Sequence, residues 1–365
     1  MQAILTDIKD WLTRGHSVAL ATLVATEGSS PREVGAVLAV NDRGAVVGSL
    51  SSGCVESVIV EVALAVIASG EAQLLTFGEP EDEFAIGLTC GGTMQVFVEH
   101  LVPEYGELTL AELLLATERA TTEPVAICTR LGSKPTKCIV LTSGSMSGSL
   151  GDANLDMQIR GDAQSLLALG ESRQVVRGCE AATSIFVASL ATPPHLLIFG
   201  AVEFARALCQ LGRPLGYRTT VCDARSRFAT KARFPEADQL EVLWPHAYFE
   251  RYGALIDART VIVVLSHDPK FDVPALTAAV KTPAHYIGAL GSRRAQAERH
   301  QRLVDAGLSE SDLARIAAPT GLDLGARTAA ETAISILAEV IALRHGRQGG
   351  RLSSTQTPIH ARTEL

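Results

Sequence analysis

After residue 194 the sequence alternates between strand-like and helix-like segments, and this feature most constrains the fold. Strands are expected at residues 195–200, 217–223, 260–266 and 285–288, and helices at 203–212 and 293–306. Strands that alternate with helices in this way form a parallel sheet with crossover helices. The preceding Thr192-Pro193-Pro194 is the best candidate for an interdomain linker. The pattern predicts an α/β chain whose last large domain begins at residue 193.

The residues before this linker predict a different, α+β organisation. A short amphipathic helix opens the chain, and Asn41-Asp42-Arg43-Gly44 separates the two strands of a hairpin. A later helix ends near Gly70, and strands at 124–130, 138–142 and 186–189 complete the region. No internal repeat is evident. We therefore expect an α+β domain at 1–192, a parallel-sheet domain at 193–346 and a disordered tail at 347–365.

The closing helix of the second domain has a clear start signal. Thr328-Ala329-Ala330-Glu331 matches a capping box, in which the two polar side chains bind free amides of the first turn. Ile334, Leu337 and Ile341 recur at helical spacing, so we expect them to be buried. Arg344-His345-Gly346 favours the helix end.

Composition excludes several classes of protein. With 47% hydrophobic and 20% charged residues, the 365-residue chain is typical of folded globular proteins. The net charge of −8 argues against a broad surface for nucleic acid or anionic membranes. The most apolar stretches, 58–68 and 333–343, are shorter than the roughly 18 residues of a membrane-spanning helix, and no secretory signal is visible. We expect a soluble, cytoplasmic protein.

Two of the seven cysteines stand beside glycines in positions that suit a reactive thiol. The odd count and the absence of a Cys-x-x-Cys pair argue against a zinc ribbon or a secreted disulfide framework. Cys54 follows Gly53 at a helix N-terminus, where free amides stabilise a thiolate. Cys90 precedes Gly91, and a glycine there lets a ligand approach closely. For Cys54 the alternative is a buried thiol beneath a tight turn, and for Cys90 it is a glycine-rich bend at the start of a strand.

Two turns offer groups that bind anions. The first, Gly28-Ser29-Ser30-Pro31-Arg32, combines backbone amides with the Ser30 hydroxyl and the Arg32 guanidinium, which suit a phosphate. The second, Gly291-Ser292-Arg293-Arg294, leaves a strand and opens a helix, so that Ser292 caps the helix while amides and Arg293 face a phosphate. The alternative is a plain loop with a solvated arginine for the first turn and a solvated basic helix start for the second.

The turn at Gly200 occupies the place of a dinucleotide-binding fingerprint. Gly200 supplies the first glycine, and Asp223, 23 residues further on, stands where the ribose-binding acid is expected. In the fingerprint, the second glycine lets the pyrophosphate touch the backbone. Val202 stands at that position and crowds the phosphate, and Glu203 beside it adds charge repulsion. His267, after a later strand, is a candidate acid or base, or only a turn residue. The pattern predicts the fold but impairs standard NAD(P) binding.

Taken together, these segments resemble the XdhC/CoxI family of molybdenum hydroxylase accessory factors over about residues 15–346. The resemblance rests on motifs that follow one another at 28–32, 35–36, 48–56, 87–92, 266–268, 291–294 and 321–326. Two departures stand out. Ser52 replaces a glycine common in the cysteine loop, and Val202-Glu203 replaces the family's usual glycine-histidine pair.

The resemblance implies an N-terminal XdhC/CoxI-type domain, a C-terminal Rossmann-like domain and a maturation chaperone more than an enzyme. Such proteins bind molybdenum cofactor, support its sulfuration with a cysteine desulfurase, and insert it into a xanthine dehydrogenase-like apoenzyme. Cys54 and Cys90 are then the candidates for binding the cofactor and, through it, molybdenum, since thiolates are soft ligands. The resemblance also implies a homodimer, and the net charge of −8 argues against nucleic acid or a membrane as a partner.

Two alternatives stay open from the residues. One is an NAD(P)-dependent oxidoreductase that uses His267 as acid or base, against which Val202 argues. The other is a scaffold that docks the desulfurase and needs neither cysteine. The spacing of Cys54 and Cys90 does not decide whether they share a pocket.

Overall fold

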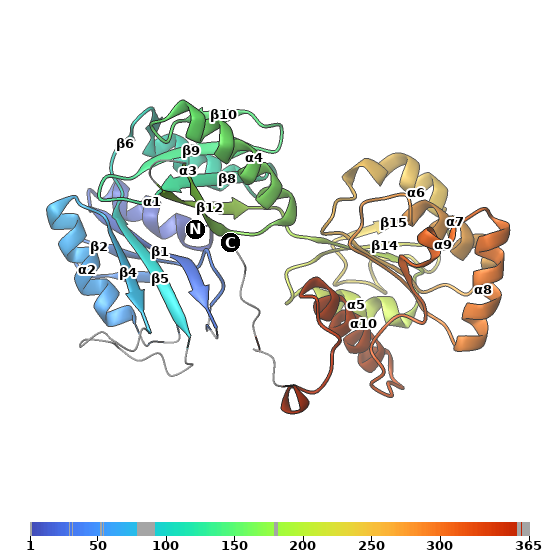
Figure 1. Cartoon of the computed structure of the whole chain (residues 1–365). Helices are drawn as coiled ribbons and strands as arrows, with labels where there is room; N and C mark the ends of the chain where they lie inside the picture. The colour runs from blue at the N-terminus through green and yellow to red at the C-terminus, as the bar shows by residue number, and fades with distance from the viewer. Residues whose placement is uncertain are drawn as a thin grey trace. The chain divides into compact units, whose positions relative to one another are not determined.

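The computed structural model describes residues 2–28, 30, 32–51, 53, 55–78, 92–178, 182–355 and 359 (Figure 1). The chain forms two compact units that divide between Thr192 and Pro193. The first unit contains antiparallel sheets with helices, and the second contains one parallel sheet between helices. The predicted class, an α+β domain followed by a parallel-sheet domain, is confirmed.

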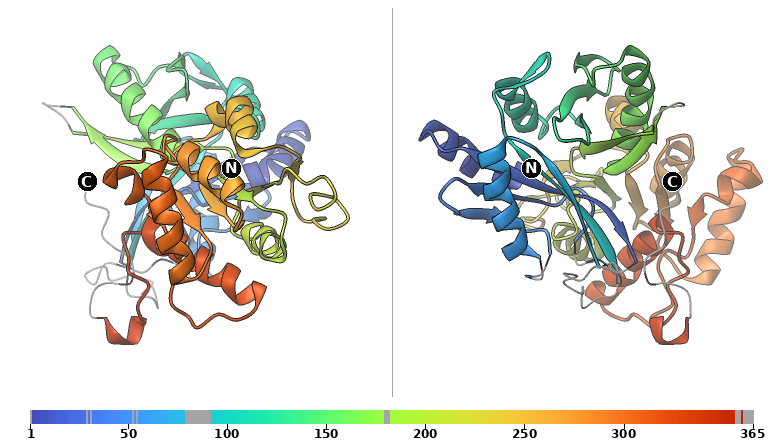
Figure 2. Two further views of the ribbon diagram at one scale, coloured as in Figure 1. Left: turned by 90° about the vertical axis from the view of Figure 1, so that its right-hand side faces the viewer. Right: turned by 60° about the vertical axis from the view of Figure 1, so that its left-hand side comes forward.

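The first half of the first unit is a five-stranded antiparallel sheet in the order β3-β2-β1-β5-β4. Its elements are α1 (Leu5–Thr13), β1 (Val18–Glu27), β2 (Val37–Asn41), β3 (Val46–Gly48), α2 (Glu56–Ser69), β4 (Gln73–Phe77) and β5 (Thr93–His100). Helix α2 packs on β1, β2 and β5, and it lies along one face of the blue and cyan strands in Figure 2. Its buried residues Ile59, Ala63 and Val66 recur at helical spacing.

The second half of the unit has the same arrangement. Its elements are α3 (Leu110–Arg119), β8 (Val125–Arg130), β9 (Thr136–Leu141), β10 (Met146–Gly148), α4 (Ala153–Leu169), β11 (Arg173–Arg177) and β12 (Thr183–Leu190). The strand order β10-β9-β8-β12-β11 matches that of the first half element for element, and a hairpin of β6 (Glu104–Tyr105) and β7 (Leu108–Thr109) lies between the halves. Helices α3 and α4 were not predicted, although Thr109 and Glu112 form a capping box at the start of α3.

The match between the halves extends to the hydrogen-bond register. Thr22 pairs with Val37 in the first sheet, and Thr129 pairs with Lys137 in the second. The expectation of no internal repeat was therefore wrong. The repeat lies in strand order and register, with short matching segments such as Gly-Ser-Leu at 48–50 and 148–150. Strand order and register need only alternating apolar side chains on a buried face, so most of the repeat leaves no obvious mark in the sequence.

Matching glycines let the short third strand of each half lie close to its neighbour. Gly48 and Gly148 have φ of +91° and +79°, a region that favours glycine. A Cβ atom on Gly48 would lie 2.3 Å from the Val37 carbonyl oxygen, and one on Gly148 would lie 2.7 Å from the Lys137 carbonyl oxygen. No larger side chain fits at either position without a shift of the backbone.

The inner faces of the two sheets are buried partly against each other and partly against α1 and α3. Alternate residues of β1 face α2 on the outer side, whereas Leu20, Thr22 and Val24 face the second half. Phe97 of β5 and Phe186 of β12, which occupy matching positions, share one hydrophobic cluster. Helices α2 and α4 cover the outer faces.

The second unit is a six-stranded parallel sheet in the order β15-β14-β13-β16-β17-β18. Its strands are β13 (His195–Phe199), β14 (Arg218–Cys222), β15 (Gln239–Glu241), β16 (Val261–Val264), β17 (Tyr286–Ala289) and β18 (Ile316–Ala317). Its helices are α5 (Glu203–Gly212), α6 (Pro245–Tyr252), α7 (Pro269–Ala279), α8 (Arg293–Asp305), α9 (Glu310–Leu313) and α10 (Ala329–Arg344). Counted along the chain, the strand order is 3-2-1-4-5-6, which is that of dinucleotide-binding folds.

The closing helix α10 confirms one prediction and contradicts another. The capping box of Thr328 and Glu331 is present, and Leu337 is buried as expected. Ile334 and Ile341, however, are 49% and 43% exposed. Helix α10 carries apolar residues around most of its circumference, so their spacing does not determine which side is buried. In the described part of the chain, no helix is both long and apolar enough to cross a membrane.

The close approach at Gly48 gives a test of the repeat. We expect Gly48→Ala to lower the free energy of unfolding by about 2 kcal/mol or more, because the left-handed backbone costs about 1 kcal/mol and the new methyl group meets the Val37 carbonyl. Gly148→Ala should cost a similar amount. Gly44→Ala is the matched control, with φ +76° and no described atom within 4 Å of its Cβ position. Urea unfolding followed by circular dichroism would contradict the prediction if Gly48→Ala cost no more than Gly44→Ala.

Candidate functional site

Three loops leave the same end of the first sheet. Strand β1 ends at Glu27, which pairs with Thr93 at the start of β5. Strand β3 ends at Gly48, which pairs with Leu38 near the start of β2. Antiparallel neighbours bring the end of one strand beside the start of the next. The segments that follow Glu27 and Gly48 and the segment that leads into Thr93 are therefore all attached at this end of the sheet.

These loops carry half of the predicted site residues. Ser30 is partly exposed, and Arg32 and Gly53 are exposed. The Ser30 hydroxyl donates to the Arg32 carbonyl oxygen at 2.9 Å, which braces the turn. Cys54, Cys90 and Gly91 lie outside the described residues, so their roles stay predictions.

Glu56, the first residue of α2, braces the loop that precedes it. Its carboxylate accepts hydrogen bonds from the Ser51 amide (2.8 Å), the Ser49 hydroxyl (3.2 Å) and the Val55 amide (3.2 Å). Burial opposes ionisation, but these bonds outweigh it and lower the pKa of Glu56 to about 2. Asp156 occupies the matching position in the second half and accepts equivalent bonds. The hydrogen bonds of the Glu56 carboxylate therefore go to the loop that precedes α2, which they hold in place.

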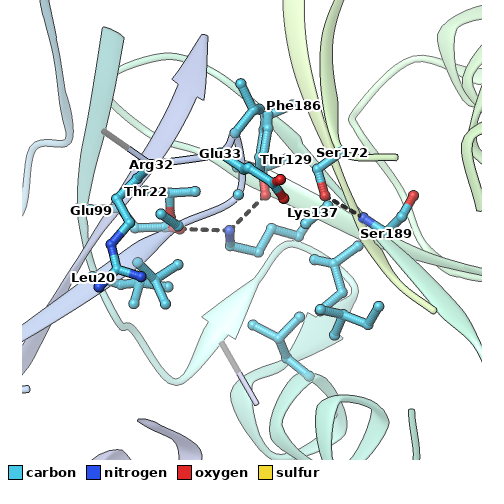
Figure 3. Close-up of a pocket in the computed structure, with 18 of the residues that line it drawn as sticks. Leu20, Thr22, Arg32, Glu33, Glu99, Thr129, Lys137, Ser172, Phe186 and Ser189 are labelled. Atoms are coloured by element: carbon cyan, nitrogen blue, oxygen red, sulfur yellow. Dashed lines mark hydrogen bonds and ion pairs between the residues drawn. The ribbon is translucent and has the colours of Figure 1, made fainter. Parts of the chain in front are cut away.

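A cavity of about 530 Å³ opens between the inner faces of the two sheets (Figure 3). We call it the inter-sheet cavity. Both halves of the unit line it, and its lining residues include Leu20, Thr22, Arg32, Glu99, Leu101, Ile127, Thr129, Lys137, Phe186, Ala188 and Leu190. Arg32 and Glu33 are its exposed lining residues, so the loop after β1 reaches the edge of this cavity.

A buried ion pair crosses the inter-sheet cavity. Lys137 Nζ lies 2.7 Å from Glu99 Oε1 and 2.8 Å from Thr129 Oγ1, and Figure 3 shows the lysine reaching between them. The side chains of Lys137 and Glu99 are only 4% and 3% exposed. Glu99 Oε2 is buried and has no hydrogen-bond partner among the described residues. The Tyr105 ring covers the pair on one side, with its centroid 5.1 Å from Lys137 Nζ.

Sequence reasoning missed this pair. Lys137 stands between Thr136 and Cys138 in a mostly apolar strand, and Glu99 closes the alternating strand β5. A charge within a buried strand was the available signal, because buried charges need partners. The partner could not be identified from sequence, since it comes from the other half.

In the second unit, the predicted residues gather at the carboxyl ends of the parallel strands. Gly200 follows β13, Asp223 follows β14, His267 follows β16, and Gly291 and Ser292 follow β17. Ligands bind at this end in such sheets. Ser292 caps α8 as predicted, since its hydroxyl accepts from the Ala295 amide at 3.2 Å, and Arg293 and His267 are exposed.

Asp223 is already bonded within the protein. Its carboxylate accepts from the Ala201 amide at 2.8 Å and pairs with the Arg225 guanidinium at 2.7 Å. Burial raises the pKa of Asp223, but the Arg225 and amide bonds outweigh burial and hold it below its usual value. A ribose hydroxyl would have to compete with these bonds. Together with Val202, this geometry disfavours dinucleotide binding.

A buried arginine that sequence reasoning missed joins the loops after β16 and β17. Arg299 donates to the carbonyl oxygens of Ser266 (3.4 Å) and Leu290 (3.0 Å) and pairs with Asp272 at 3.0 Å. It therefore fixes the segments that carry His267 and Gly291. Among the described residues, no group of three or more His, Cys, Asp or Glu side chains is arranged to hold a metal ion.

The bonds of Glu56 predict a pH dependence. The folded pKa of about 2 lies below the ordinary 4.5, so ionised Glu56 stabilises the fold above about pH 4.5, and this contribution is lost as the pH falls towards 2. Glu56→Gln should therefore unfold at lower urea than wild type at pH 7, and the gap should narrow below about pH 4.5. Glu61→Gln, exposed on the same helix, is the control. A gap of equal size at pH 3 would contradict the prediction.

The ion pair predicts a non-additive pair of substitutions. Lys137→Met leaves the Glu99 carboxylate buried without its cation and should cost about 3–5 kcal/mol of stability. The double variant Glu99→Ala/Lys137→Val removes both charges and should recover most of that loss. Lys9→Ala breaks an exposed pair with Glu118 and should cost less than about 1 kcal/mol. Urea unfolding measures all three, and equal losses in the single and double variants would refute the burial argument.

Comparison with known proteins assigns both units to one kind of protein. The XdhC and CoxI family matches residues 11–78, which include the loop with Arg32 and the loop with Gly53. The XdhC Rossmann domain matches residues 196–340, within the second unit. A solved structure described as a xanthine dehydrogenase from Bacillus halodurans has the same fold, with a TM-score of 0.67 at 23% identity over 96% of this chain and 98% of that one.

Two curated relatives align over nearly the whole sequence. A protein of Bacillus subtilis, named as a probable xanthine dehydrogenase subunit, is 28% identical over 90% of this chain and 94% of its own length. The molybdenum cofactor insertion chaperone PaoD of Escherichia coli is 28% identical over 94% of this chain and 91% of its own length. With both family regions matched in order and these relatives aligned end to end, the chain belongs to the XdhC and CoxI family.

Proposed function

We propose that this chain binds molybdenum cofactor and inserts it into a xanthine dehydrogenase-like molybdenum hydroxylase. The names of the two curated relatives support this function. The structural observation that carries it is the common origin of three loops at one end of the first sheet, because they bear Cys54, Cys90 and Arg32. One of these loops also lines the inter-sheet cavity.

The residues at this end of the sheet suit such a cofactor. Thiolates are soft ligands for molybdenum, and a guanidinium with nearby amides suits a phosphate. The cofactor, when bound, supplies a molybdenum centre coordinated by sulfur. Cys54 and Cys90 are proposed to contact that end, and Ser30, Arg32, Gly53 and Gly91 are proposed to contribute to the same site. Glu56 keeps the cysteine loop in place, since its carboxylate is bonded to Ser51 and Val55.

Further parts of the proposal follow from the family resemblance. The chain would support sulfuration of the cofactor together with a cysteine desulfurase, and it would act in the cytoplasm as a homodimer. Gly291, Ser292 and Arg293 of the second unit are proposed as a separate site for a phosphate or nucleotide, because Ser292 caps a helix whose first residues include Arg293.

An anaerobic titration with molybdenum cofactor tests the carrier function. Wild type should retain about one equivalent of molybdenum through gel filtration, and Cys54→Ala and Cys90→Ala should lose most of it, because each removes a soft ligand. Cys179→Ala is the matched control: Cys179 precedes Phe186 by seven residues, as Cys90 precedes Phe97, and these phenylalanines hold matching positions in the two halves.

Two outcomes would overturn the proposal. If wild type retained no molybdenum but bound NAD(H), an oxidoreductase would be the function to pursue. If both cysteine variants retained molybdenum and still supported hydroxylase maturation, the thiols would not form the site.

A further inference from the structure

The charges in the inter-sheet cavity stand where the two halves of the first unit differ. Most matching positions that face the cavity are alike, as with Thr22 and Thr129, or Leu101 and Leu190. The register pairs Glu99 with Leu20 in the first half and Ala188 with Ile127 in the second, so Ala188 matches Glu99. In the same way Val37 matches Lys137. The matched pairs are Leu20/Ile127, Thr22/Thr129, Val37/Lys137, Glu99/Ala188 and Leu101/Leu190.

This substitution pattern indicates that the sheet can be built with an apolar residue at either charged position. Both halves build the same sheet. The second half has Ala188 where the first has Glu99, and the first half has Val37 where the second has Lys137. Burying a carboxylate and an ammonium costs desolvation energy that apolar side chains avoid. The pair therefore calls for a role other than stability, and the cavity beside it indicates ligand binding.

The pair offers an acceptor beside a donor. Glu99 Oε1 and Thr129 Oγ1 take two of the three N–H donors of Lys137, and no described residue forms a hydrogen bond with the third. Glu99 Oε2 is a buried acceptor to which no described residue donates in hydrogen-bond geometry, although burial and the nearby Glu99 carboxylate raise the pKa of the Tyr105 hydroxyl. A ring that carries an N–H beside a C=O, the lactam edge of an oxopyrimidine, complements this arrangement, because its N–H donates to the carboxylate and its oxygen accepts from the ammonium.

The rest of the cavity suits a flat ring with an anionic substituent. Leu20, Ile127 and Phe186 supply apolar walls from both sheets. Arg32 is exposed at the edge of the cavity and supplies a cation there, while the exposed Glu33 carboxylate lies at the same edge. A volume of about 530 Å³ falls within the range of small-molecule sites.

We propose that the inter-sheet cavity binds a fused oxopyrimidine ring through Glu99 and Lys137, and that this ring is the pterin end of molybdenum cofactor. The assignment to a pterin rests on the proposed function, whereas recognition of the lactam edge does not. A purine such as xanthine carries the same edge and is the second source of this chemistry.

The experiment titrates the full chain with 6-carboxypterin, followed by pterin fluorescence, and with xanthine, followed by calorimetry. Whichever ligand binds wild type should bind Glu99→Ala/Lys137→Val and Glu99→Gln with an affinity lower by roughly tenfold or more, since each variant removes a charged hydrogen-bond partner. The double variant installs the residues of the matching positions and is expected to fold. Glu99→Gln keeps the shape of the side chain and provides a second variant if the double one does not fold.

Two further comparisons separate recognition of the edge from general binding. The 3-methyl derivative of the pterin lacks the lactam N–H and should bind as weakly to wild type as 6-carboxypterin binds to the double variant. Arg32→Ala should weaken 6-carboxypterin but leave unsubstituted pterin unchanged. Lys9→Ala/Glu118→Ala removes an exposed ion pair of the same unit and should change nothing.

The outcomes distinguish this proposal from the carrier function. Suppose that wild type and the double variant retain molybdenum cofactor equally well and that neither 6-carboxypterin nor xanthine binds. This result would overturn the cavity proposal and leave the carrier function standing. Binding of xanthine that depends on Glu99, by a chain that retains no molybdenum, would support recognition of the edge and refute the pterin assignment. Equal affinity of wild type and Glu99→Gln for 6-carboxypterin would refute the role of the carboxylate.

Discussion

The first unit depends on the burial of the inner faces of its two sheets, against each other and against α1 and α3. Each half forms one five-stranded sheet with one helix, α2 or α4, on its outer side. Helix α1 covers part of the inner face of the first sheet, and α3 covers part of the inner face of the second. The apolar surface that remains would be exposed if either half stood alone, and exposed apolar surface is costly in water. Phe97 and Phe186 close the interface at matching positions. Where the faces do not close, they leave the inter-sheet cavity.

Buried polar side chains fix the loops that the fold brings to each site. Glu56 binds the amides of the segment before α2, Asp223 binds the amide after Gly200, and Arg299 binds two carbonyls after β16 and β17. Each satisfies backbone groups that no strand or helix satisfies, at positions where chain segments leave regular structure. Loop positions in both units are therefore set by a few charged groups whose loss would release them.

Local signals predicted much of the second unit and less of the first. Helix α5 and the capping box of α10 were predicted correctly, because caps and helical periodicity involve neighbouring residues. The buried side of α10 was predicted correctly for Leu337 and wrongly for Ile334 and Ile341, since helical spacing fits these two as well as it fits the buried Ile336 and Val340. Of the candidate site residues, Ser292 has its predicted capping role, while Asp223 proved to be bonded to Ala201.

The sequence by itself determined the class of each unit, the glycine-rich loops and the family, because strand and helix periods, caps and ordered motifs are properties of contiguous residues. Only the tertiary structure revealed the repeat, the inter-sheet cavity and the pairing of Glu99 with Lys137. These depend on register between strands distant in sequence, and the 38 residues from Glu99 to Lys137 carry no local mark of their contact. Side chains that meet across two sheets become neighbours only when both inner faces are buried together.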